Sequence, residues 1–251
     1  MRLISKFFAV NSRLSSRLDR KLNPDHGDLY RKFYATVEKE FGALPPGAVA
    51  VDLGGGRRCE YAHAVPAHGD VRLVAVDISE KELAANVDVT DTRTADVAKG
   101  LPFGDAEVDL IVSNFLLEHV DGVPAAVEHM ARVLKPGGRT IHFLPCRYST
   151  FATAARLLPF GPLLKVLHLM IPETKGHVEF DVHYDHGYPI AMERLFRSVG
   201  FRYVSVETTP ISASYFFPFL PAYLLVWAYE SLVRRIDARS LMAYMMVSAE
   251  R

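Results

Sequence analysis

An apolar segment that ends in three consecutive glycines restricts the fold of this chain more than any other feature. Residues 48–53 read AVAVDL, and Gly54, Gly55 and Gly56 follow directly. The segment is short, rich in β-branched side chains and nearly free of polar ones, as expected for a strand buried on both faces. Glycine is required after such a strand where the backbone needs a positive φ or where a ligand approaches it closely. A tight turn without a ligand would use the same residues, so the glycines alone leave both interpretations open.

Further apolar segments follow the first one, with helical segments between them. We expect strands at residues 71–76, 93–95, 108–113, 138–144, 201–206 and 241–248, and helices at 123–134 and 190–199. In the helix at 123–134, Asp121 stands in the capping position and Pro124 in the first turn, and a Lys-Pro-Gly-Gly sequence ends it. Strands that alternate with helices predict an α/β fold with a mostly parallel sheet and right-handed crossovers.

Two helices are expected before the first strand, at residues 1–23 and 25–41. The first is amphipathic and basic, because apolar residues recur every three or four positions and a single acid, Asp19, stands among six basic residues. Such a helix can lie on an anionic membrane surface, or it can pack its apolar stripe against the rest of the protein. A targeting presequence would have a similar composition. Since two prolines and a glycine then break the chain, we expect an N-terminal helical segment, residues 1–46, and one domain, residues 47–251.

Two acids end the second and third predicted strands. Asp77 closes the sequence LVAVD, 21 residues beyond Gly56, where a carboxylate can accept hydrogen bonds from both hydroxyls of a ribose. It would also suit a helix cap. Asp96 ends the third strand, where it can accept a hydrogen bond from an exocyclic amine such as that of adenine. A dehydrogenase is disfavoured, because its GxGxxG fingerprint would need a glycine where Cys59 stands.

Five motifs occur in order along the chain: VDLGGG, VAVD, ADVAKGLPF, SNFLLEHV and LKPGG. With them, residues 48–145 resemble the class I S-adenosylmethionine-dependent methyltransferases, and among these the type 11-like group that acts on small molecules. The resemblance implies a Rossmann-like, seven-stranded and mostly parallel sheet with helices on both faces, with S-adenosylmethionine as the cofactor. There is one departure, since Arg58 stands where the family often has a further glycine. Arg57 or Arg58 could therefore bind the cofactor's carboxylate.

By the same resemblance, nine residues are expected to bind the cofactor: Asp52, Gly54, Gly56, Asp77, Ile78, Asp96, Val97, Asn114 and Phe115. Asp52 would contact the amino group of the methionine portion, and the two glycines would lie beneath the cofactor. Asp77 would bind the ribose, and Asp96 with the Val97 backbone would hold the adenine. The last two residues of the set would contact the methionine portion near the reactive methyl group.

Three histidines are candidates for a general base: His119, His183 and His186. His119 follows the fourth predicted strand, where it could equally make a structural hydrogen bond. The other two lie in the sequence GHVEFDVHYDHGY, whose carboxylates could tune a histidine toward neutral pH. A polar lid without direct chemistry and a metal site are the alternatives for this stretch, and we expect no metal. On the histidines alone we favour an oxygen atom as the methyl acceptor, because an alcohol must lose its proton.

Two apolar insertions interrupt the strand-helix alternation, residues 146–187 and 207–240, and both are expected at the edge of the sheet where ligands bind. Residues 208–229 hold no charged side chain, but three prolines within them argue against a membrane-spanning helix. We expect an apolar lid or an interfacial helix that carries Trp227 and Tyr229. A dimer interface or core packing would also explain these segments.

Charge and cysteine content limit the partners. The chain has 29 basic and 29 acidic residues, so no field attracts nucleic acid, and none is expected as a partner. Its two cysteines lack metal-ligand spacing, which favours a reducing cytoplasm. We expect a cytoplasmic enzyme, in contact with the inner face of the membrane, that methylates a small hydrophobic or lipid-linked acceptor. The alternatives are a methyltransferase of a polar metabolite with an apolar homodimer interface, and a catalytically silent binding subunit.

Overall fold

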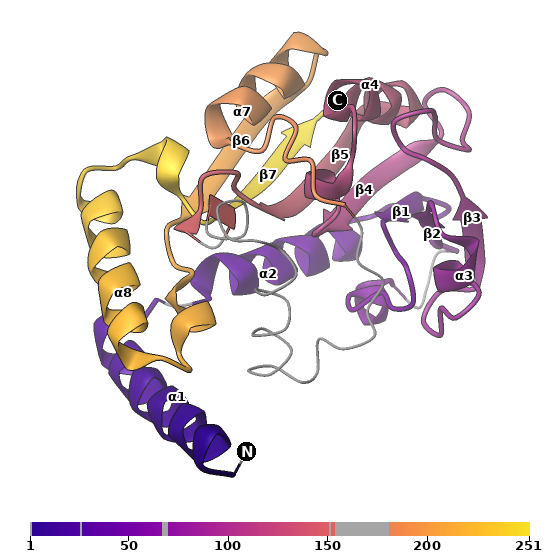
Figure 1. Cartoon of the computed structure of the whole chain (residues 1–251). Coiled ribbons are helices and arrows are strands. Elements are labelled where there is room, and N and C mark those ends of the chain that lie inside the picture. Colours follow the sequence, from indigo (N-terminus) through magenta and orange to yellow (C-terminus); the bar gives the residue numbers. More distant parts are fainter. Residues whose placement is uncertain (1, 26, 67–69, 151, 154–180) are drawn as a thin grey trace. The chain divides into compact units, whose positions relative to one another are not determined.

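The computed structural model describes residues 2–25, 27–66, 70–150, 152–153 and 181–251 (Figure 1). The chain divides into two compact units. One comprises Met1–Asp28, Pro145–Asp181 and Thr208–Tyr244, and the other comprises Leu29–Leu144, Val182–Glu207 and Met245–Arg251. The second unit, which we call the sheet unit, holds nearly all of the sheet. The first, which we call the helical unit, holds the first helix and the segment after the sixth strand.

The sheet has seven strands in the order β3-β2-β1-β4-β5-β7-β6. The strands are β1 Val49–Leu53, β2 Arg72–Asp77, β3 Asp91–Thr94, β4 Val108–Asn114, β5 Leu134–Pro145, β6 Arg202–Thr209 and β7 Tyr244–Glu250. The pairs β1–β2, β1–β4, β2–β3 and β4–β5 are parallel. The seven-stranded, mostly parallel α/β sheet that the sequence predicts is therefore confirmed.

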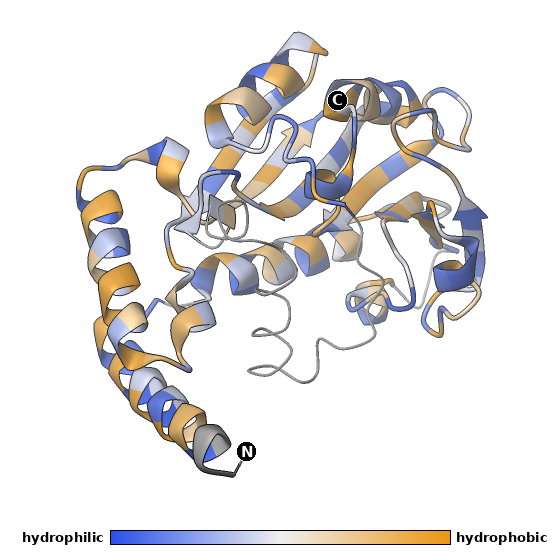
Figure 2. Cartoon of the chain, viewed as in Figure 1, coloured by the Kyte–Doolittle hydropathy of each residue, from blue (hydrophilic) through white to orange (hydrophobic). Residues whose placement is uncertain are grey.

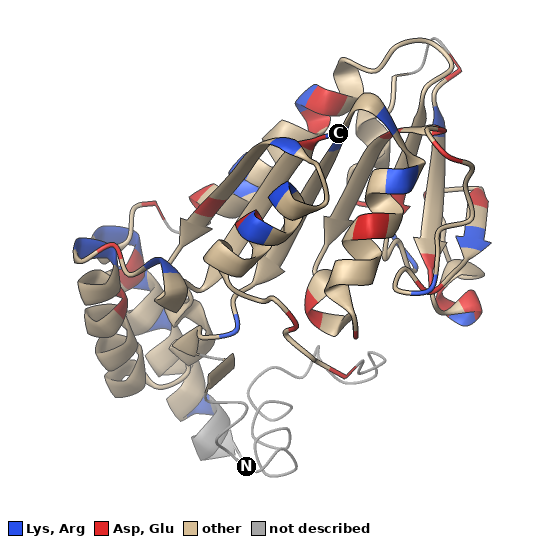
Figure 3. Cartoon of the chain, turned by 90° about the horizontal axis from the view of Figure 1, so that it is seen from above, with Lys and Arg blue, Asp and Glu red and all other residues tan. Residues whose placement is uncertain are grey.

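Helices cover both faces of the sheet. Helix α2 (Asp28–Gly42) lies on one face, and α4 (Val123–Val133) and α7 (Pro189–Ser198) lie on the other (Figure 1). A short helix, α3 (Glu80–Leu83), follows β2. In Figure 3 the strands are mostly tan whereas α4 and α7 carry blue and red positions, because their charged side chains face away from the sheet. All five residues of β1 are buried, as the sequence predicts for a central strand.

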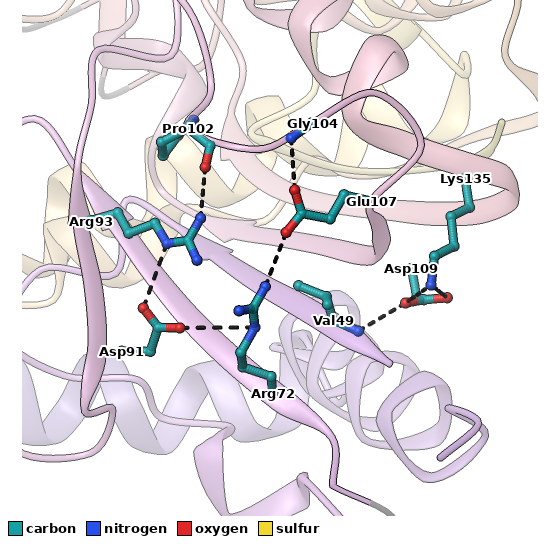
Figure 4. Close-up of polar contacts among 9 residues, drawn as sticks. All are labelled: Val49, Arg72, Asp91, Arg93, Pro102, Gly104, Glu107, Asp109 and Lys135. Atoms are coloured by element: carbon teal, nitrogen blue, oxygen red, sulfur yellow. Dashed lines mark hydrogen bonds and ion pairs between the residues drawn. The ribbon is translucent and has the colours of Figure 1, made fainter. Parts of the chain in front are cut away.

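Polar contacts tie together the amino ends of the strands (Figure 4). Lys135, near the start of β5, binds both carboxylate oxygens of Asp109 at 2.9 and 2.7 Å, and Asp109 accepts a hydrogen bond from the backbone N–H of Val49 at 2.8 Å. Arg72, at the start of β2, donates to Glu107 at 3.1 Å. These pairs tie together the amino edge of the sheet, whereas ligands of such sheets bind at the carboxyl edge.

Two local predictions need correction. The residue that caps α4 is not Asp121 but Gly122, which has φ of 96° and makes no side-chain capping bond. The left-handed residue turns the chain just before the helix, and the carboxylate of Asp185 accepts the hydrogen bond from Val123 N instead, at 3.1 Å. Strand β5 begins at Leu134 rather than at residue 138, because the pairing with β4 shifts register between Val108 and Leu110 and takes the Lys-Pro-Gly-Gly sequence into the strand.

The helical unit contains α1 (Arg2–Leu22) and α8 (Leu220–Arg235), which contact each other, and a short 3-10 turn before α8. No helix within the described part of the chain has both the length and the apolar character needed to cross a bilayer. Most of the insertion expected at 146–187 lies outside the described residues. The expected boundary between residues 46 and 47 stays a prediction.

Candidate functional site

The turn after β1 needs its glycines for close packing. Gly54 has φ of 80°, and a Cβ there would lie 3.0 Å from the side chain of Leu116. At Gly55 a Cβ would lie 2.9 Å from both a carboxylate oxygen of Asp52 and the side chain of Ala75. Any larger residue would displace β1, β2 or the loop after β4. The first two glycines therefore place a bare backbone at the carboxyl edge of the sheet.

Asp77 lies at the end of β2, beside this turn. One of its oxygens accepts a hydrogen bond from Gly56 N at 3.2 Å, and the other accepts one from Ser79 N at 2.8 Å. These amides hold the carboxylate in place, and each oxygen keeps a further lone pair for an outside donor. The neighbouring Ile78 is 57% exposed, so its side chain can contact a bound molecule.

Asp52 is buried at the end of β1 and accepts a hydrogen bond from the hydroxyl of Tyr61. Burial raises the pKa of Asp52 to about 6, although the bond from Tyr61 lowers it. At neutral pH the group is therefore mostly an anion held close to solvent. It opens onto a pocket whose lining residues are Asp52, Gly54, Arg58, Glu60, Tyr61 and Asn114.

Asn114, the last residue of β4, faces the same pocket from the opposite side. Its Nδ2 donates to the hydroxyl of Tyr30 at 3.2 Å and to that of Tyr34 at 3.4 Å. Its Oδ1 is buried and has no hydrogen-bond partner among the described residues. A buried amide oxygen without a donor is costly, so this atom indicates that a ligand with an N–H or O–H group belongs here.

An aromatic cluster surrounds the end of β4. Phe115 has φ of 54°, and its ring is 40% exposed. Ring centroids lie 6.1 Å apart for Phe115 and Tyr30, 5.4 Å for Phe115 and Phe143, and 5.0 Å for Tyr30 and Phe143. Tyr34 continues the cluster, 4.9 Å from Tyr30. Helix α2, strand β5 and the residue after β4 thus supply a cluster of rings, tilted or edge-to-face to one another, next to Asn114.

Asp96 and Val97 lie after β3, as the sequence predicts. The Asp96 carboxylate accepts a hydrogen bond from Ala98 N at 3.0 Å and pairs with Lys99 at 2.9 Å. The hydrogen bond from Lys99 is the main reason that the pKa of Asp96 is lowered. Asp96 is therefore ionised at neutral pH and able to accept from an amine. Val97 is buried beside it.

The two arginines after the glycines are engaged with acids. Arg57 donates to Glu82, with Nη2 at 2.8 Å, and Arg58 donates to Asp88 at 2.7 Å. Arg58 nevertheless lines the pocket. The side-chain amide of Asn86 donates to the carbonyls of both Gly55 and Gly56 and so helps to hold the glycine turn in place.

The three predicted histidines lie in a different place. His119 Nε2 is 3.9 Å from a carboxylate oxygen of Glu118, and the carbonyl of Glu118 accepts a hydrogen bond from His183 N at 2.8 Å. The side chain of His183 is exposed, and His186 Nδ1 lies 2.8 Å from Asp185. None of the three is among the described residues that line the pocket. A catalytic role for any of them stays a prediction.

Glu118, next to His119, is a buried carboxyl group that the sequence did not indicate. It is 3% exposed, and burial raises its pKa to about 8. Its Oε2 has no hydrogen-bond partner among the described residues. The described residues contain no group of three or more side chains that could hold a metal ion, and the first part of the GHVEFDVHYDHGY stretch, up to residue 180, lies outside them.

Sequence reasoning missed the residues that α2 contributes. Tyr30 and Tyr34 are one helical turn apart, and Tyr34 also donates to the carboxylate of Glu60 at the pocket. The spacing of the two tyrosines can be read from the sequence, but no sequence pattern indicates that α2 packs over the end of β4. Tyr61 and Glu60 follow the glycines closely and could have been found by asking which polar groups satisfy a buried Asp52.

The fold agrees with comparisons to known proteins. Residues 51–142 match the family model described as a methyltransferase domain. Among solved structures, phosphoethanolamine N-methyltransferase 2 of Haemonchus contortus has a TM-score of 0.54 at 16% identity, covering 87% of this chain and 52% of that one. Geranyl diphosphate C-methyltransferase of Streptomyces coelicolor A3(2) has a TM-score of 0.53 at 16% identity, covering 93% and 84%. Residues 51–142 are thus a class I, type 11-like methyltransferase domain.

Curated relatives share part of the sequence. The chain is 36% identical to the demethylmenaquinone methyltransferase of Mycobacterium tuberculosis (strain ATCC 25618 / H37Rv) over 116 residues, covering 44% of this chain and 47% of the relative. It is 31% identical to the ubiquinone/menaquinone biosynthesis C-methyltransferase UbiE of Shewanella frigidimarina (strain NCIMB 400) over 123 residues, with the same coverage. The chain thus spans about half the length of the curated relatives it matches.

Proposed function

We propose that this protein binds S-adenosylmethionine at the carboxyl edge of its sheet and transfers the methyl group to a lipid-linked acceptor with a flat, aromatic or quinone-like head. The observation that carries the proposal is the buried Asn114 Oδ1, which has no hydrogen-bond partner among the described residues, in a side chain that lines the same pocket as Asp52 and Gly54. The methyltransferase domain match and the relatives named as quinone methyltransferases support it.

The residues present fit the cofactor. Asp77 is held by two backbone amides and can accept from the ribose hydroxyls, and Asp96 can accept from the adenine amine. Asp52, anionic at neutral pH, can balance the ammonium group of the methionine portion, and Asn114 Oδ1 would accept one of its N–H groups. The bound cofactor supplies a methyl group activated by a sulfonium.

The contribution of the protein is mainly to orient the acceptor. The exposed ring of Phe115 offers a flat surface beside Asn114, with Tyr30 and Phe143 behind it. A planar head group that stacks there is restricted to a few orientations, and restriction of this kind can supply several kcal/mol, roughly 7–11 in favourable cases. The hydroxyls of Tyr30 and Tyr34 are within reach of Asn114 and can position polar substituents of the head.

A carbon atom is the acceptor that we now propose. The oxygen preference rested on histidines, and none of them lines the described pocket. The relatives from Shewanella are named as C-methyltransferases, which supports carbon as the acceptor but does not replace a direct assay.

A transfer assay with methyl-labelled cofactor tests this function. The acceptors would be a demethylated quinone with a lipid tail, its tail-less head group and a polar phenol. We expect labelled product with the lipid-tailed head group, carrying the methyl on carbon by mass spectrometry, and about a hundredfold less product with Asn114→Ala. Label on oxygen would overturn the acceptor atom. Binding of the cofactor without product from any acceptor, total lipid extract included, would instead support a silent binding subunit.

A further inference from the structure

Helix α1 buries two polar residues and exposes three apolar ones. Ser15 and Asp19 are buried, at 0% and 5% exposure, whereas Phe7, Val10 and Leu14 are exposed at 51%, 53% and 44%. The exposed residues follow one another at intervals of three and four, so they form one face. A surface helix that faces water has the opposite arrangement. The exposed face of α1 is therefore suited to an apolar environment.

Hydrogen bonds to α8 hold α1 in this orientation. The carboxylate of Asp19 accepts from Asn23 Nδ2 at 2.8 Å and from the hydroxyl of Tyr223 at 3.2 Å. Near the middle of α1, Asn11 Oδ1 accepts from Leu220 N, the first amide of α8, at 3.1 Å. Rotating α1 to bury Phe7 would break the hydrogen bonds that Asp19 accepts from Tyr223 and that Asn11 accepts from Leu220 N.

Helix α8 has the same arrangement. Its single acid, Glu230, is buried and accepts hydrogen bonds from the N–H and the hydroxyl of Ser212 at 2.7 and 2.8 Å. It also buries Tyr223 and Val233, whereas Leu225 and Leu232 are exposed at 74% and 56%, and Ile236, which follows the helix directly, at 61%. Figure 2 shows orange positions along both α1 and α8. Two neighbouring helices of the helical unit thus expose apolar faces together.

The exposed charges on these helices have one sign. The acids of α1 and α8, Asp19 and Glu230, are both buried. Among the described side chains of the two helices, the exposed basic ones are Lys6, Arg13, Arg17, Arg20, Lys21, Arg234 and Arg235. One of these, Arg234, also pairs with Asp25 at 3.2 Å. An apolar face flanked by cations matches an anionic lipid surface, whereas a second copy of the same face would bring like charges together.

We propose that the exposed faces of α1 and α8 form a docking surface for an anionic lipid bilayer. The helices lie in the plane of the interface, with Phe7, Leu225 and Leu232 among the acyl chains and the basic side chains at the head groups. This inference concerns the helical unit and does not rest on the proposed function. It would explain how an enzyme without a spanning helix in its described part reaches a lipid-linked acceptor.

Vesicle sedimentation of the full chain tests the surface. We expect binding to vesicles of phosphatidylcholine with phosphatidylglycerol, little binding to phosphatidylcholine alone, and loss of binding as salt is raised. The double variant Leu225→Glu/Leu232→Glu should reduce partitioning about tenfold or more. Tyr203→Glu, in β6 and 80% exposed, is the matched control and should bind as the unaltered protein does. Circular dichroism and light scattering on each variant establish folding and oligomeric state.

Three results would overturn the proposal. Equal binding of both vesicle types, or none, would remove the role of anionic lipid. A double variant that is folded and still binds would place the contact elsewhere. A dimer that becomes a monomer in the double variant, with vesicle binding absent throughout, would assign the face to a second copy. Because this assay uses neither cofactor nor acceptor, its failure leaves the methyltransferase function untouched, and the reverse also holds.

Discussion

Helices α1 and α2 are both amphipathic and follow one another in the sequence, but they bury opposite kinds of residue. Helix α2 buries Leu29, Phe33, Val37 and Phe41, one apolar residue per turn. Helix α1 buries Ser15 and Asp19 and exposes Phe7, Val10 and Leu14. Periodicity identifies both as helices, but which side faces inward depends on what the rest of the fold offers. Helix α2 meets the apolar sheet, and α1 meets Tyr223 and the first amide of α8.

Two matched truncations test this contrast with the largest expected effect. Phe33→Ala removes a fully buried ring that contacts Tyr34 and Phe143, and it should lower the free energy of unfolding by about 4–5 kcal/mol. Phe7→Ala in α1 should change it by about 0.5 kcal/mol or less, because the ring is half exposed. Urea unfolding measures both. Similar losses for the two variants would mean that Phe7 is also buried in solution.

The two units also differ in their buried carboxyl groups. Burial raises the pKa from 4.5 to about 8 for Glu118 in the sheet unit and to about 7 for Glu230 in the helical unit, where bonds from Ser212 oppose the rise. The folded chain then holds a proton that the unfolded chain has lost. The contribution of these two groups to stability should therefore fall as the pH rises from about 4.5 toward 8 and level off above that.

Glutamine variants isolate each contribution. Glu118→Gln should remove a decline of about 5 kcal/mol over that pH range, and Glu230→Gln should remove a smaller one that ends at about pH 7. Urea titrations across the pH range provide the measurement. A decline that persists unchanged in Glu118→Gln would show that this carboxyl is solvated.

Asp19 provides a smaller test of the inverted helix. Asp19→Ala leaves the hydroxyl of Tyr223 without its acceptor in a buried place, which should cost about 1–3 kcal/mol. Asp19→Asn keeps an acceptor oxygen and should recover part of the loss. If both variants are as stable as the unaltered protein, the buried bonds do not hold α1 in place.

The smallest effect is expected on the exposed face of α1. Val10→Gln should leave the free energy of unfolding within about 0.5 kcal/mol of its original value, since the side chain is 53% exposed. Val37→Gln, at the equivalent place in α2, buries an amide and should cost several times more. Thermal unfolding of the two variants compares them directly. A large loss of stability in Val10→Gln would show that this face of α1 is not exposed.

The sequence predicted the sheet well, because central parallel strands are short apolar segments and a turn that requires glycine is visible in the sequence. Strands β1, β2 and β4 lie within a residue of their expected bounds. The prediction was poorer where distant segments meet. Asp185 caps α4 from a loop more than fifty residues away, and Tyr30 reaches Asn114 across the sheet edge. Neither contact leaves a periodic pattern, so local rules gave α4 the wrong cap and gave α2 no role in the site.

The central claim is that the carboxyl edge of the sheet binds S-adenosylmethionine, and calorimetric titration measures this directly. We predict one cofactor per chain for the unaltered protein and an affinity lower by about tenfold or more for Asp77→Ala, whose carboxylate otherwise accepts from the ribose. Thermal unfolding should show the variant to be folded. An unaltered protein that gives no binding heat at several temperatures, or an Asp77→Ala variant that binds equally well, would contradict the account.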